Sequence, residues 1–280
     1  MNVSVKSRYA EEMKAAIHAA NAAAAVITAK WDQTLNVQKK GSVDLVTEVD
    51  QAAEDAILSV LRSRYPADEF IAEETGAYPG TSGRVWYIDP LDGTTNFSHG
   101  FPHFCTSIGL FSEGRPLVAV ITEPLRDWCF TAEQGCGAYL NGKKLKVSTT
   151  DTLTDALLAT GFPYDRWTNP DNNSHRVAHI LRRCQGVRRA GAAALDLAYT
   201  AAGWLDGYWE DRLNPWDVGA GLLLVQEAGG IVSDFQGQPA RAESPSFVAA
   251  NAGLHPALLD AVNEAPPIDT KTRLRGGGSS

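Results

Sequence analysis

One stretch of nine residues decides what this chain is expected to be: Asp89-Pro90-Leu91-Asp92-Gly93-Thr94-Thr95-Asn96-Phe97. It follows directly on the apolar run Val85-Trp86-Tyr87-Ile88, which predicts a buried strand. Two carboxylates therefore stand at a strand end, and Pro90 predicts a tight turn that brings them together. Carboxylate oxygens suit Mg²⁺, and the N–H groups at a helix start suit a phosphate. The stretch predicts a metal-dependent phosphate site.

The segment after these carboxylates supplies the phosphate-binding part of the prediction. Gly93-Thr94-Thr95 predicts the start of a short helix, whose N–H groups and dipole would face an anion. A threonine that only caps the helix is the plainer interpretation. Capping and phosphate binding are compatible here, so both stay open.

Two further acids stand in comparable positions. Glu73 follows a short strand predicted at Phe70-Ile71-Ala72, and Asp217 is in the first turn of a helix predicted after Asn214-Pro215. Taken singly, each is equally well explained as a solvated turn or as a partner of the helix dipole. Together with the two strand-end carboxylates, they provide oxygen ligands for two Mg²⁺ ions that share carboxylates and a substrate phosphate.

Composition narrows the class of function. The 280 residues are 44% hydrophobic and 21% charged, which is ordinary for a globular protein. The net charge of −8 argues against nucleic acid or an anionic membrane as the main partner. The four cysteines form no CxxC pair, which favours small buried residues in a reducing cytosol over a zinc site. No signal peptide or apolar stretch of membrane-spanning length is evident, so we predict a cytoplasmic protein.

Patterning predicts an α+β half followed by an α/β half. In the first half, an Ala-rich helix and a second helix precede short strands in an antiparallel meander. The second half alternates helices and strands, and the Gly/Ser-rich end predicts a disordered tail. The expected boundaries are 1–148 for the α+β half, 149–266 for the α/β half and 267–280 for the tail. The expected helices are 9–30, 49–65, 172–184, 193–202, 216–228 and 256–262, and the meander is 106–140.

Several motifs together resemble those of the inositol monophosphatase family. They occur in the family's order and span residues from about 44 to 230. The resemblance implies a layered αβαβα sandwich of the sugar-phosphatase type, a homodimer, and an Mg²⁺-dependent phosphatase sensitive to Li⁺. The motifs are Asp44-Leu45-Val46-Thr47-Glu48-Val49-Asp50, Phe70-Ile71-Ala72-Glu73-Glu74-Thr75, the stretch from Asp89 to Phe97, Pro215-Trp216-Asp217-Val218-Gly219-Ala220-Gly221 and Glu227-Ala228-Gly229-Gly230.

The same resemblance implies the metal ligands. Glu73, Asp89 and the backbone carbonyl of Leu91 would hold the first Mg²⁺. Asp89, Asp92 and Asp217 would hold the second. A third, weaker ion would lie near Glu73 through waters, which makes two to three ions in all, with Mn²⁺ as a possible substitute. We therefore expect Asp89 to be the ligand that both main ions share.

The resemblance also implies how water and phosphate are held. Thr94, paired with Asp44, would orient the attacking water on the first ion, so that Glu73, Thr94 and Asp44 form the expected catalytic set. The phosphate would rest on the ions and on the N–H groups of Gly93 and Thr94. No covalent phosphoenzyme is expected, because metal-activated water can attack the phosphorus directly.

The organic part of the substrate would meet residues of the second half. Gly191, Ala192 and Ala193 would line it, and Glu210 would accept its hydroxyl groups. The family has a small hydroxylated residue where this chain has Ala192, which weakens the assignment of the alcohol. All of these roles are implied by the resemblance.

A small phosphate monoester is the expected substrate, and inositol monophosphate leads because Glu210 suits a polyol. Histidinol phosphate is the main alternative, since Glu210-Asp211 would equally meet an amino group. Fructose 1,6-bisphosphate, NADP⁺ and 3′-phosphoadenosine nucleotides are further alternatives within related enzymes. A non-catalytic protein that binds metal and phosphate is disfavoured, because all four expected acids are present.

Overall fold

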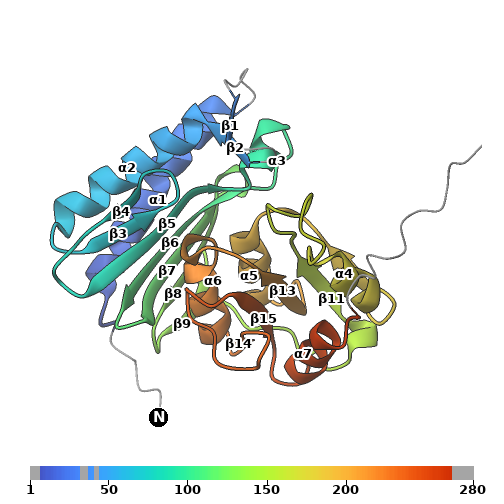
Figure 1. Ribbon diagram of the computed structural model, residues 1–280. Coiled ribbons are helices and arrows are strands. Elements are labelled where there is room, and N and C mark those ends of the chain that lie inside the picture. Colours follow the sequence, from blue (N-terminus) through green and yellow to red (C-terminus); the bar gives the residue numbers. More distant parts are fainter. Residues whose placement is uncertain (1–6, 32–36, 41–43, 267–280) are drawn as a thin grey trace, which may run out of the picture.

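The computed structural model describes residues 7–31, 37–40 and 44–266, with the backbone alone described at 37–40 and 44–47. It has five layers: two helices, an eight-stranded sheet, two helices, a five-stranded sheet and two outer helices (Figure 1). Three apolar clusters fill the spaces between successive layers. The expected αβαβα sandwich is confirmed.

The first sheet continues the predicted meander with strands on either side. Its order is β10-β9-β8-β7-β6-β5-β3-β4, and neighbouring strands are antiparallel except β3 and β5. Strand β3 and the end of β5 therefore run side by side toward the same edge. The strands are β3 (Glu69–Ala72), β4 (Gly76–Tyr78), β5 (Arg84–Asp92), β6 (Cys105–Ser112), β7 (Arg115–Glu123), β8 (Trp128–Glu133), β9 (Gly137–Leu140) and β10 (Lys143–Lys144).

Helices α1 (Ala10–Lys30) and α2 (Glu48–Arg64) cover the outer face of this sheet. The side of α1 that faces inward is made mainly of alanines and ends with Ile27, which lets the two helices pack closely. Between them, β1 (Val37–Lys40) and β2 (Asp44–Thr47) form an antiparallel hairpin. The hairpin leads directly into α2.

The second sheet has the order β12-β11-β13-β15-β14 and mixes parallel and antiparallel pairs. Two inner helices, α5 and α6, separate it from the first sheet, and α4 and α7 cover its other face (Figure 1). These elements are β11 (Leu157–Thr160), β12 (Gly186–Arg188), β13 (Gly207–Asp211), β14 (Ile231–Ser233), β15 (Ser246–Ala250), α4 (Ser174–Ile180), α5 (Ala193–Ala201), α6 (Pro215–Glu227) and α7 (His255–Asn263).

Helix α6 has apolar residues around almost its whole circumference, because it packs against the first sheet on one side and against α5 on the other. Its residues from Val218 to Val225 are buried between β5–β8 and α5. A side chain at Gly221 would clash with Leu197 of α5, and one at Gly219 would lie 3.3 Å from the ring of Phe111. These close approaches fix the start of α6, and with it Asp217, above the end of β5.

Most predicted helices agree with the structure to within one or two residues, but α4 is much shorter than the expected 172–184. Strands β4 and β11 had no counterpart among the expected elements. The division into 1–148 and 149–266 stays a prediction, and the tail at 267–280 lies outside the described residues.

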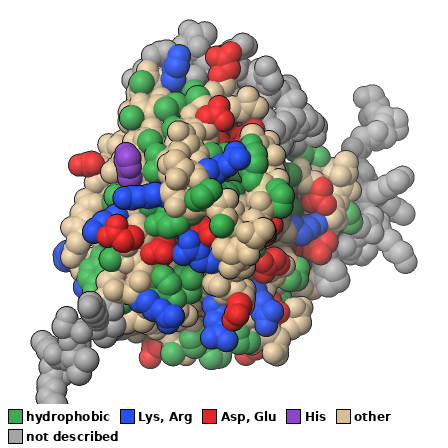
Figure 2. Space-filling model, turned by 90° about the vertical axis from the view of Figure 1, so that its left-hand side faces the viewer, with side chains coloured by type: hydrophobic (Ala, Val, Ile, Leu, Met, Phe, Trp, Pro, Cys, Tyr) green, Lys and Arg blue, Asp and Glu red, His purple; other side chains and the backbone are tan. Residues whose placement is uncertain are grey.

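The molecular surface mixes charges of both signs. On the face that Figure 2 presents, Lys and Arg side chains lie among Asp and Glu side chains. Within the described parts of the chain, no helix combines the length and the apolar character that crossing a membrane requires.

Candidate active site

The site is built on an irregularity in strand β5. Asp89 pairs with Ser107 of β6, whereas Asp92 pairs with Cys105, so two residues of β5 stand opposite the single residue Thr106. The hydroxyl of Thr106 donates to the carbonyl of Pro90 at 2.9 Å, which holds the extra residue in place. This is a β-bulge within a strand. The tight turn predicted at Pro90 is therefore wrong.

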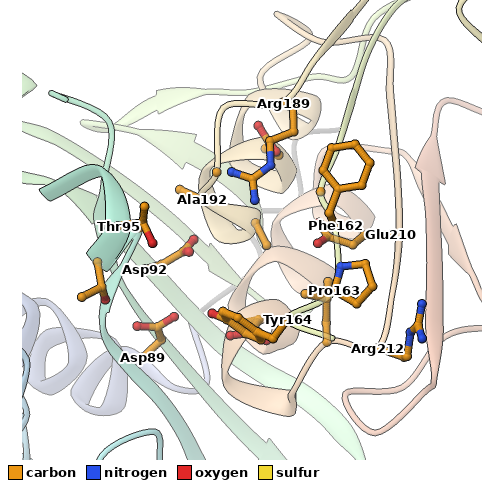
Figure 3. A pocket seen from close by; sticks show the side chains of 18 of the residues that line it. Asp89, Asp92, Thr95, Phe162, Pro163, Tyr164, Arg189, Ala192, Glu210 and Arg212 are labelled. Carbon is orange, nitrogen blue, oxygen red and sulfur yellow. The ribbon is translucent and has the colours of Figure 1, made fainter. Parts of the chain in front are cut away.

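The bulge changes which side of the sheet each residue faces. Trp86, Ile88 and Leu91 all belong to the core under α1 and α2, although strict alternation would put Leu91 on the other face. Asp89 and Asp92, three positions apart, thereby line the same pocket (Figure 3). With strict alternation over these three positions, the two carboxylates would point in opposite directions.

Gly93 ends the strand and starts the short helix α3 (Thr94–Ser98), as predicted. Its φ is +97°, and a Cβ there would lie 3.0 Å from the carbonyl oxygen of His103 and 3.2 Å from Cβ of Phe104. Only glycine combines this backbone conformation with so little space. The strand consequently turns at once into the helix that carries Thr94.

The hydroxyl of Thr94 contacts Asp50, an acid of helix α2. Its Oγ1 donates to Oδ1 of Asp50 at 2.8 Å and is 3.0 Å from the carbonyl oxygen of Leu91. Asp50 is in the first turn of α2 and is 1% exposed. The side chain of Asp44, the expected partner, lies outside the described residues. The pairing of Thr94 with Asp44 therefore stays a prediction, and Asp50 is a partner that the sequence analysis did not assign.

Backbone N–H groups hold the three other carboxylates of this group. Asp89 accepts from Leu91 at 3.0 Å, and Asp217 accepts from Asn214 at 2.7 Å in a capping box. Asp92 accepts from Ala194 at 2.7 Å, which ties the first sheet to the start of α5. The carboxylates are therefore positioned by secondary structure and not by flexible side-chain contacts.

Glu73 comes from the neighbouring strand. It directly follows β3, and its N–H donates to the carbonyl of Ile88 at 3.2 Å, so the parallel pairing continues to the edge of the sheet. Glu73 and Asp217 line the same pocket as the β5 carboxylates. The structure thus brings together the four acids that the sequence singled out.

Burial and mutual repulsion strongly disfavour negative charge here. Burial raises the pKa of Asp89 well above its usual range, and Glu73, Asp92, Asp217 and Asp50 raise it further. Burial also raises the pKa values of Asp92 and Asp217 to about 7. Among the described residues, Asp89, Asp92 and Asp217 make no ion pair with Lys or Arg. A bound cation would relieve this repulsion.

The chemical type of the donor atoms in this pocket fits Mg²⁺. These donors are carboxylates and the carbonyl of Leu91, all hard oxygen ligands. The Asp, Glu, His and Cys side chains of the described segments form no group of three that could hold an ion by themselves. Asp92 and Asp217 each direct one oxygen to a backbone N–H. Because Mg²⁺ keeps several waters and shares substrate oxygens, it does not need a closed cage of protein ligands.

The opposite wall of the pocket comes from the second half of the chain (Figure 3). Gly191, with φ +89°, and Ala192 lead into α5 and line the pocket together with Ala193, as expected. Asn96 of α3 donates to the carbonyls of His103 at 2.7 Å and Ala190 at 2.9 Å, which fixes this turn to the phosphate side.

Glu210 is on β13 and lines the pocket. The hydroxyl of Tyr208 donates to its Oε2 at 2.7 Å, and Gly161 packs directly against its carboxylate. Burial raises the pKa of Glu210 to about 7, against the hydrogen bond from Tyr208 and the charge of Arg189, which both lower it. A group that titrates near neutrality in a pocket is a candidate for contact with substrate.

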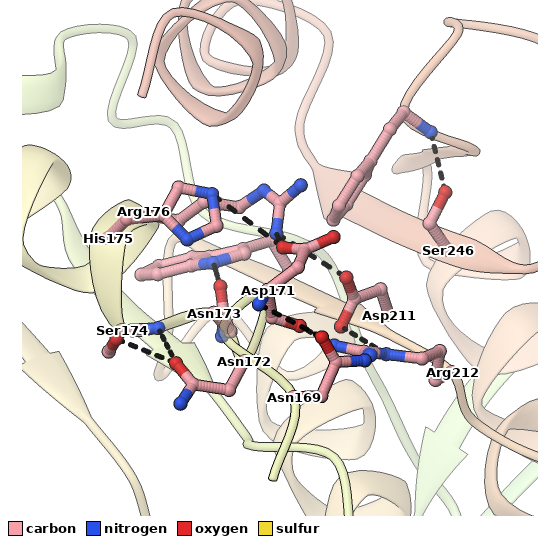
Figure 4. A network of polar contacts seen from close by, with 12 residues as sticks. Asn169, Asp171, Asn172, Asn173, Ser174, His175, Arg176, Asp211, Arg212 and Ser246 are labelled. Atoms are coloured by element: carbon pink, nitrogen blue, oxygen red, sulfur yellow. Dashed lines mark hydrogen bonds and ion pairs between the residues drawn. The ribbon is translucent and has the colours of Figure 1, made fainter. Parts of the chain in front are cut away.

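A loop from Phe162 to Asn172 forms the mouth of the pocket, and a polar network holds it (Figure 4). Arg212, at φ +58°, pairs with Asp165 of the loop at 3.2 Å and contacts the carbonyl of Asp171. Arg176 of α4 reaches Asp171 at 3.2 Å and Asp211 at 3.4 Å. These pairs anchor the loop to both α4 and β13.

Sequence reasoning missed three parts of this site. Asp50 was inside a quoted motif, but no role was given to it. Asp196, which lines the pocket, is a single acid in the otherwise apolar run of α5, and that contrast was the signal available. The mouth loop shows no motif in the sequence, and its ion pair from Asp165 to Arg212 joins residues far apart along the chain.

Comparisons with known proteins all relate this chain to one family along most of its length. A model of the inositol monophosphatase family matches residues 9–266. The Nus factor SuhB of Pseudomonas aeruginosa is 46% identical over 242 residues, which cover 85% of this chain and 89% of that protein. An inositol-1-monophosphatase of Synechocystis is 43% identical over 256 residues, or 91% of this chain and 89% of the relative.

A solved structure supports the same relationship. The inositol monophosphatase from Anabaena (Nostoc) has 41% sequence identity and a TM-score of 0.85, and the match covers 92% of this chain and 98% of that one. An inositol monophosphatase from Thermotoga maritima has 34% identity and a TM-score of 0.84, over 91% of this chain and 98% of that one.

Proposed function

Since this chain belongs to the inositol monophosphatase family and is a phosphoric monoester hydrolase, we propose that it hydrolyses inositol monophosphate to inositol and phosphate with Mg²⁺. The observation that carries the proposal is the convergence of Glu73, Asp89, Asp92 and Asp217 on one pocket. The family is generally metal-dependent, and these oxygen donors fit Mg²⁺.

We propose the ligand sets that the family resemblance implies. Glu73, Asp89 and the carbonyl of Leu91 would hold one ion, and Asp89, Asp92 and Asp217 a second. Bound Mg²⁺ supplies such a site with a water of lowered pKa and with charge stabilisation for the leaving oxygen. The bulge in β5 supports this assignment, because it lets Asp89 and Asp92 face the same ions.

Thr94 and Asp50 would orient the attacking water. Because the Thr94 proton is donated to Asp50, the lone pairs of Oγ1 remain free to accept a proton of that water. Asp50 in turn would stabilise positive charge that develops on Thr94 and the water as the proton leaves. We propose Asp50 for the role first given to Asp44.

The leaving alcohol would rest against the second half of the chain. Glu210 would accept its hydroxyl groups, and the Gly191–Ala193 turn would pack against its ring. A homodimer and sensitivity to Li⁺ belong to the same proposal.

The experiment that tests the substrate compares phosphate release from inositol 1-phosphate and from histidinol phosphate by the purified full chain at saturating Mg²⁺. We expect the higher kcat/KM with inositol 1-phosphate, and loss of both activities when a chelator removes the metal. A large preference for histidinol phosphate would overturn the inositol assignment and leave the phosphatase class intact.

A further inference from the structure

Helix α5 places an acid, Asp196, in the wall of the pocket. Asp196 is 2% exposed and is one of the residues that line the pocket. Within the described part of the chain, neither oxygen of its carboxylate has a hydrogen bond or an ion pair. The hydrogen bonds that Asp196 makes are those of its backbone N–H and carbonyl groups. A buried carboxylate without a partner is costly, so a protein that keeps one has a reason outside its own fold.

The other deeply buried acids of this chain have partners of their own. The remaining described acids that are exposed by 2% or less are Asp50, Glu54, Asp89 and Glu123, and each accepts at least one hydrogen bond from the protein. Glu54, for example, accepts from the N–H groups of Glu74 at 2.8 Å and Thr75 at 2.9 Å. Asp196 differs in that its carboxylate accepts no hydrogen bond from the described residues while it lines the pocket.

The surroundings of Asp196 indicate which partner would fit. Asp196 lies close enough to both Asp92 and Glu210 for their charges to raise its pKa further after burial has done so, and close enough to Arg189 for the opposite effect. Asp92, Asp196 and Glu210 all line the same pocket. Arg189 is exposed at the mouth, 5.9 Å from the ring of Phe162.

Asp196 and Glu210 line one pocket, and carboxylates accept hydrogen bonds and donate none when ionised. One oxygen of Glu210 already accepts from Tyr208, and both oxygens of Asp196 remain available. Neighbouring hydroxyl groups on one carbon chain or ring are the matching donors for such a pair. A site built around buried acceptors rejects analogues that lack the donor far better than a purely apolar pocket rejects an extra group.

We propose that Asp196 is a specificity-determining residue, whose carboxylate accepts a hydrogen bond from a second hydroxyl of the leaving alcohol, next to the hydroxyl that Glu210 accepts. The inference rests on the proposed function and narrows it: the substrate class is phosphate monoesters of alcohols with vicinal hydroxyl groups. Simple alkyl or aryl phosphates would use the phosphate side of the pocket alone.

The test measures kcat and KM for Asp196→Ala and Asp196→Asn with inositol 1-phosphate, glycerol 1-phosphate, p-nitrophenyl phosphate and histidinol phosphate at saturating Mg²⁺. For Asp196→Ala we expect kcat/KM to fall by about 10- to 100-fold with the two polyol phosphates, as for a lost hydrogen bond to a charged group, and mainly through KM. The loss with p-nitrophenyl phosphate should be at least tenfold smaller. Asp196→Asn keeps one acceptor oxygen and should lose less than Asp196→Ala.

Measuring Tm distinguishes a role of Asp196 in substrate recognition from a role in the stability of the fold. Asp196→Asn removes a charge that the protein does not pair, so its Tm should not fall, whereas Glu54→Gln removes charge-assisted bonds inside the protein and should lower Tm. A fall in Tm for Asp196→Asn, or equal losses with all four substrates, would overturn the proposal.

The panel also distinguishes the remaining outcomes. Losses confined to histidinol phosphate would mean that Asp196 meets an ammonium group, and the hydroxyl assignment would be wrong. If the wild type cleaves glycerol 1-phosphate but not inositol 1-phosphate, the proposed substrate fails, and the comparison of glycerol 1-phosphate with p-nitrophenyl phosphate still decides the role of Asp196. If Asp196→Ala does not fold, Asp196→Asn carries the same comparison.

Discussion

The two walls of the pocket are built in different ways. On the phosphate side, Asp89, Asp92 and Asp217 each accept a hydrogen bond from a backbone N–H, so strand and helix geometry sets their positions. On the alcohol side, Glu210 is oriented by the hydroxyl of Tyr208, and Asp196 has no described partner. The phosphate side is thus rigidly organised for one reaction, whereas side chains on the alcohol side can differ without disturbing the scaffold that holds the acids.

The largest expected effect tests the phosphate side. Asp89→Asn should lower kcat by about a thousandfold or more, because one substitution weakens both proposed ion sites. Tm without metal should not fall, since burial and four neighbouring acids already disfavour the charge. Steady-state kinetics over a range of Mg²⁺ concentrations checks the first point and calorimetry the second. Near-normal turnover at saturating Mg²⁺ would contradict the metal assignment.

A second substitution tests which acid serves Thr94. Asp50→Asn should lower kcat by about 10²- to 10⁴-fold with little change in KM, because it replaces the charged acceptor of the Thr94 proton with a neutral amide that can neither take up nor stabilise positive charge. Asp44→Asn is the matched control in the neighbouring hairpin and should have a much smaller effect. If Asp44→Asn is the more damaging of the two, the original pairing is restored.

On the alcohol side, a smaller effect is expected from Gly161→Ala. A Cβ at this position would clash with the carboxylate of Glu210, so Glu210 must move away from the pocket. We expect KM for inositol 1-phosphate to rise about tenfold, as for a weakened charge-assisted hydrogen bond, with kcat nearly unchanged. Gly186→Ala is the control, since its Cβ would make only ordinary contacts of 3.4 Å or more. An unchanged KM would mean that Glu210 does not contact the substrate.

The smallest expected effect concerns stability without metal. Asp92, Asp217 and Glu210 have pKa values raised to about 7 in the folded chain. The folded state therefore holds more protons than the unfolded state between about pH 4 and pH 7, so these groups reduce stability as the pH rises through that range. Above pH 7 their contribution levels off.

The measurement is Tm of the chelated protein between pH 5 and pH 8. We expect Tm to fall by a few degrees across this range from these groups, and Mg²⁺ to raise it more at pH 8 than at pH 5, because ligand carboxylates must be ionised. Glu210→Gln should show a shallower fall than the wild type. A Tm that rises steadily from pH 5 to pH 8 in the chelated protein would contradict the raised pKa values.

The phosphate side was largely predictable from the sequence because its acids lie in short motifs. Asp89 and Asp92 are three residues apart, and Glu73 and Asp217 each adjoin a recognisable strand or helix. The bulge was not predictable, since Pro90 after a strand indicates a turn and the opposing residue Thr106 is far along the chain. Asp50 could not be separated from Asp44, because both lie in one motif and only the fold brings Asp50 to Thr94.

The alcohol side was less predictable because its residues come from separate segments. The Gly191–Ala193 turn, Glu210 and the mouth loop meet only after the second sheet has formed. The polar network around Arg212 joins loop, helix and strand residues that show no periodic pattern. Asp196 stands within an apolar run, where helix periodicity predicts core residues and gives no indication of a pocket.

The extra residue in β5 makes the site depend on the number of residues in two paired strands as well as on which residues they are. Inserting one residue beside Thr106 would pair β6 one-to-one with β5 without removing a single carboxylate. Asp92 would then be directed at the layer of α1 and α2, and every residue of the active site would still be present in the sequence. A reader who compares only residue identities would find such a protein intact, although its two acids would no longer face a common substrate.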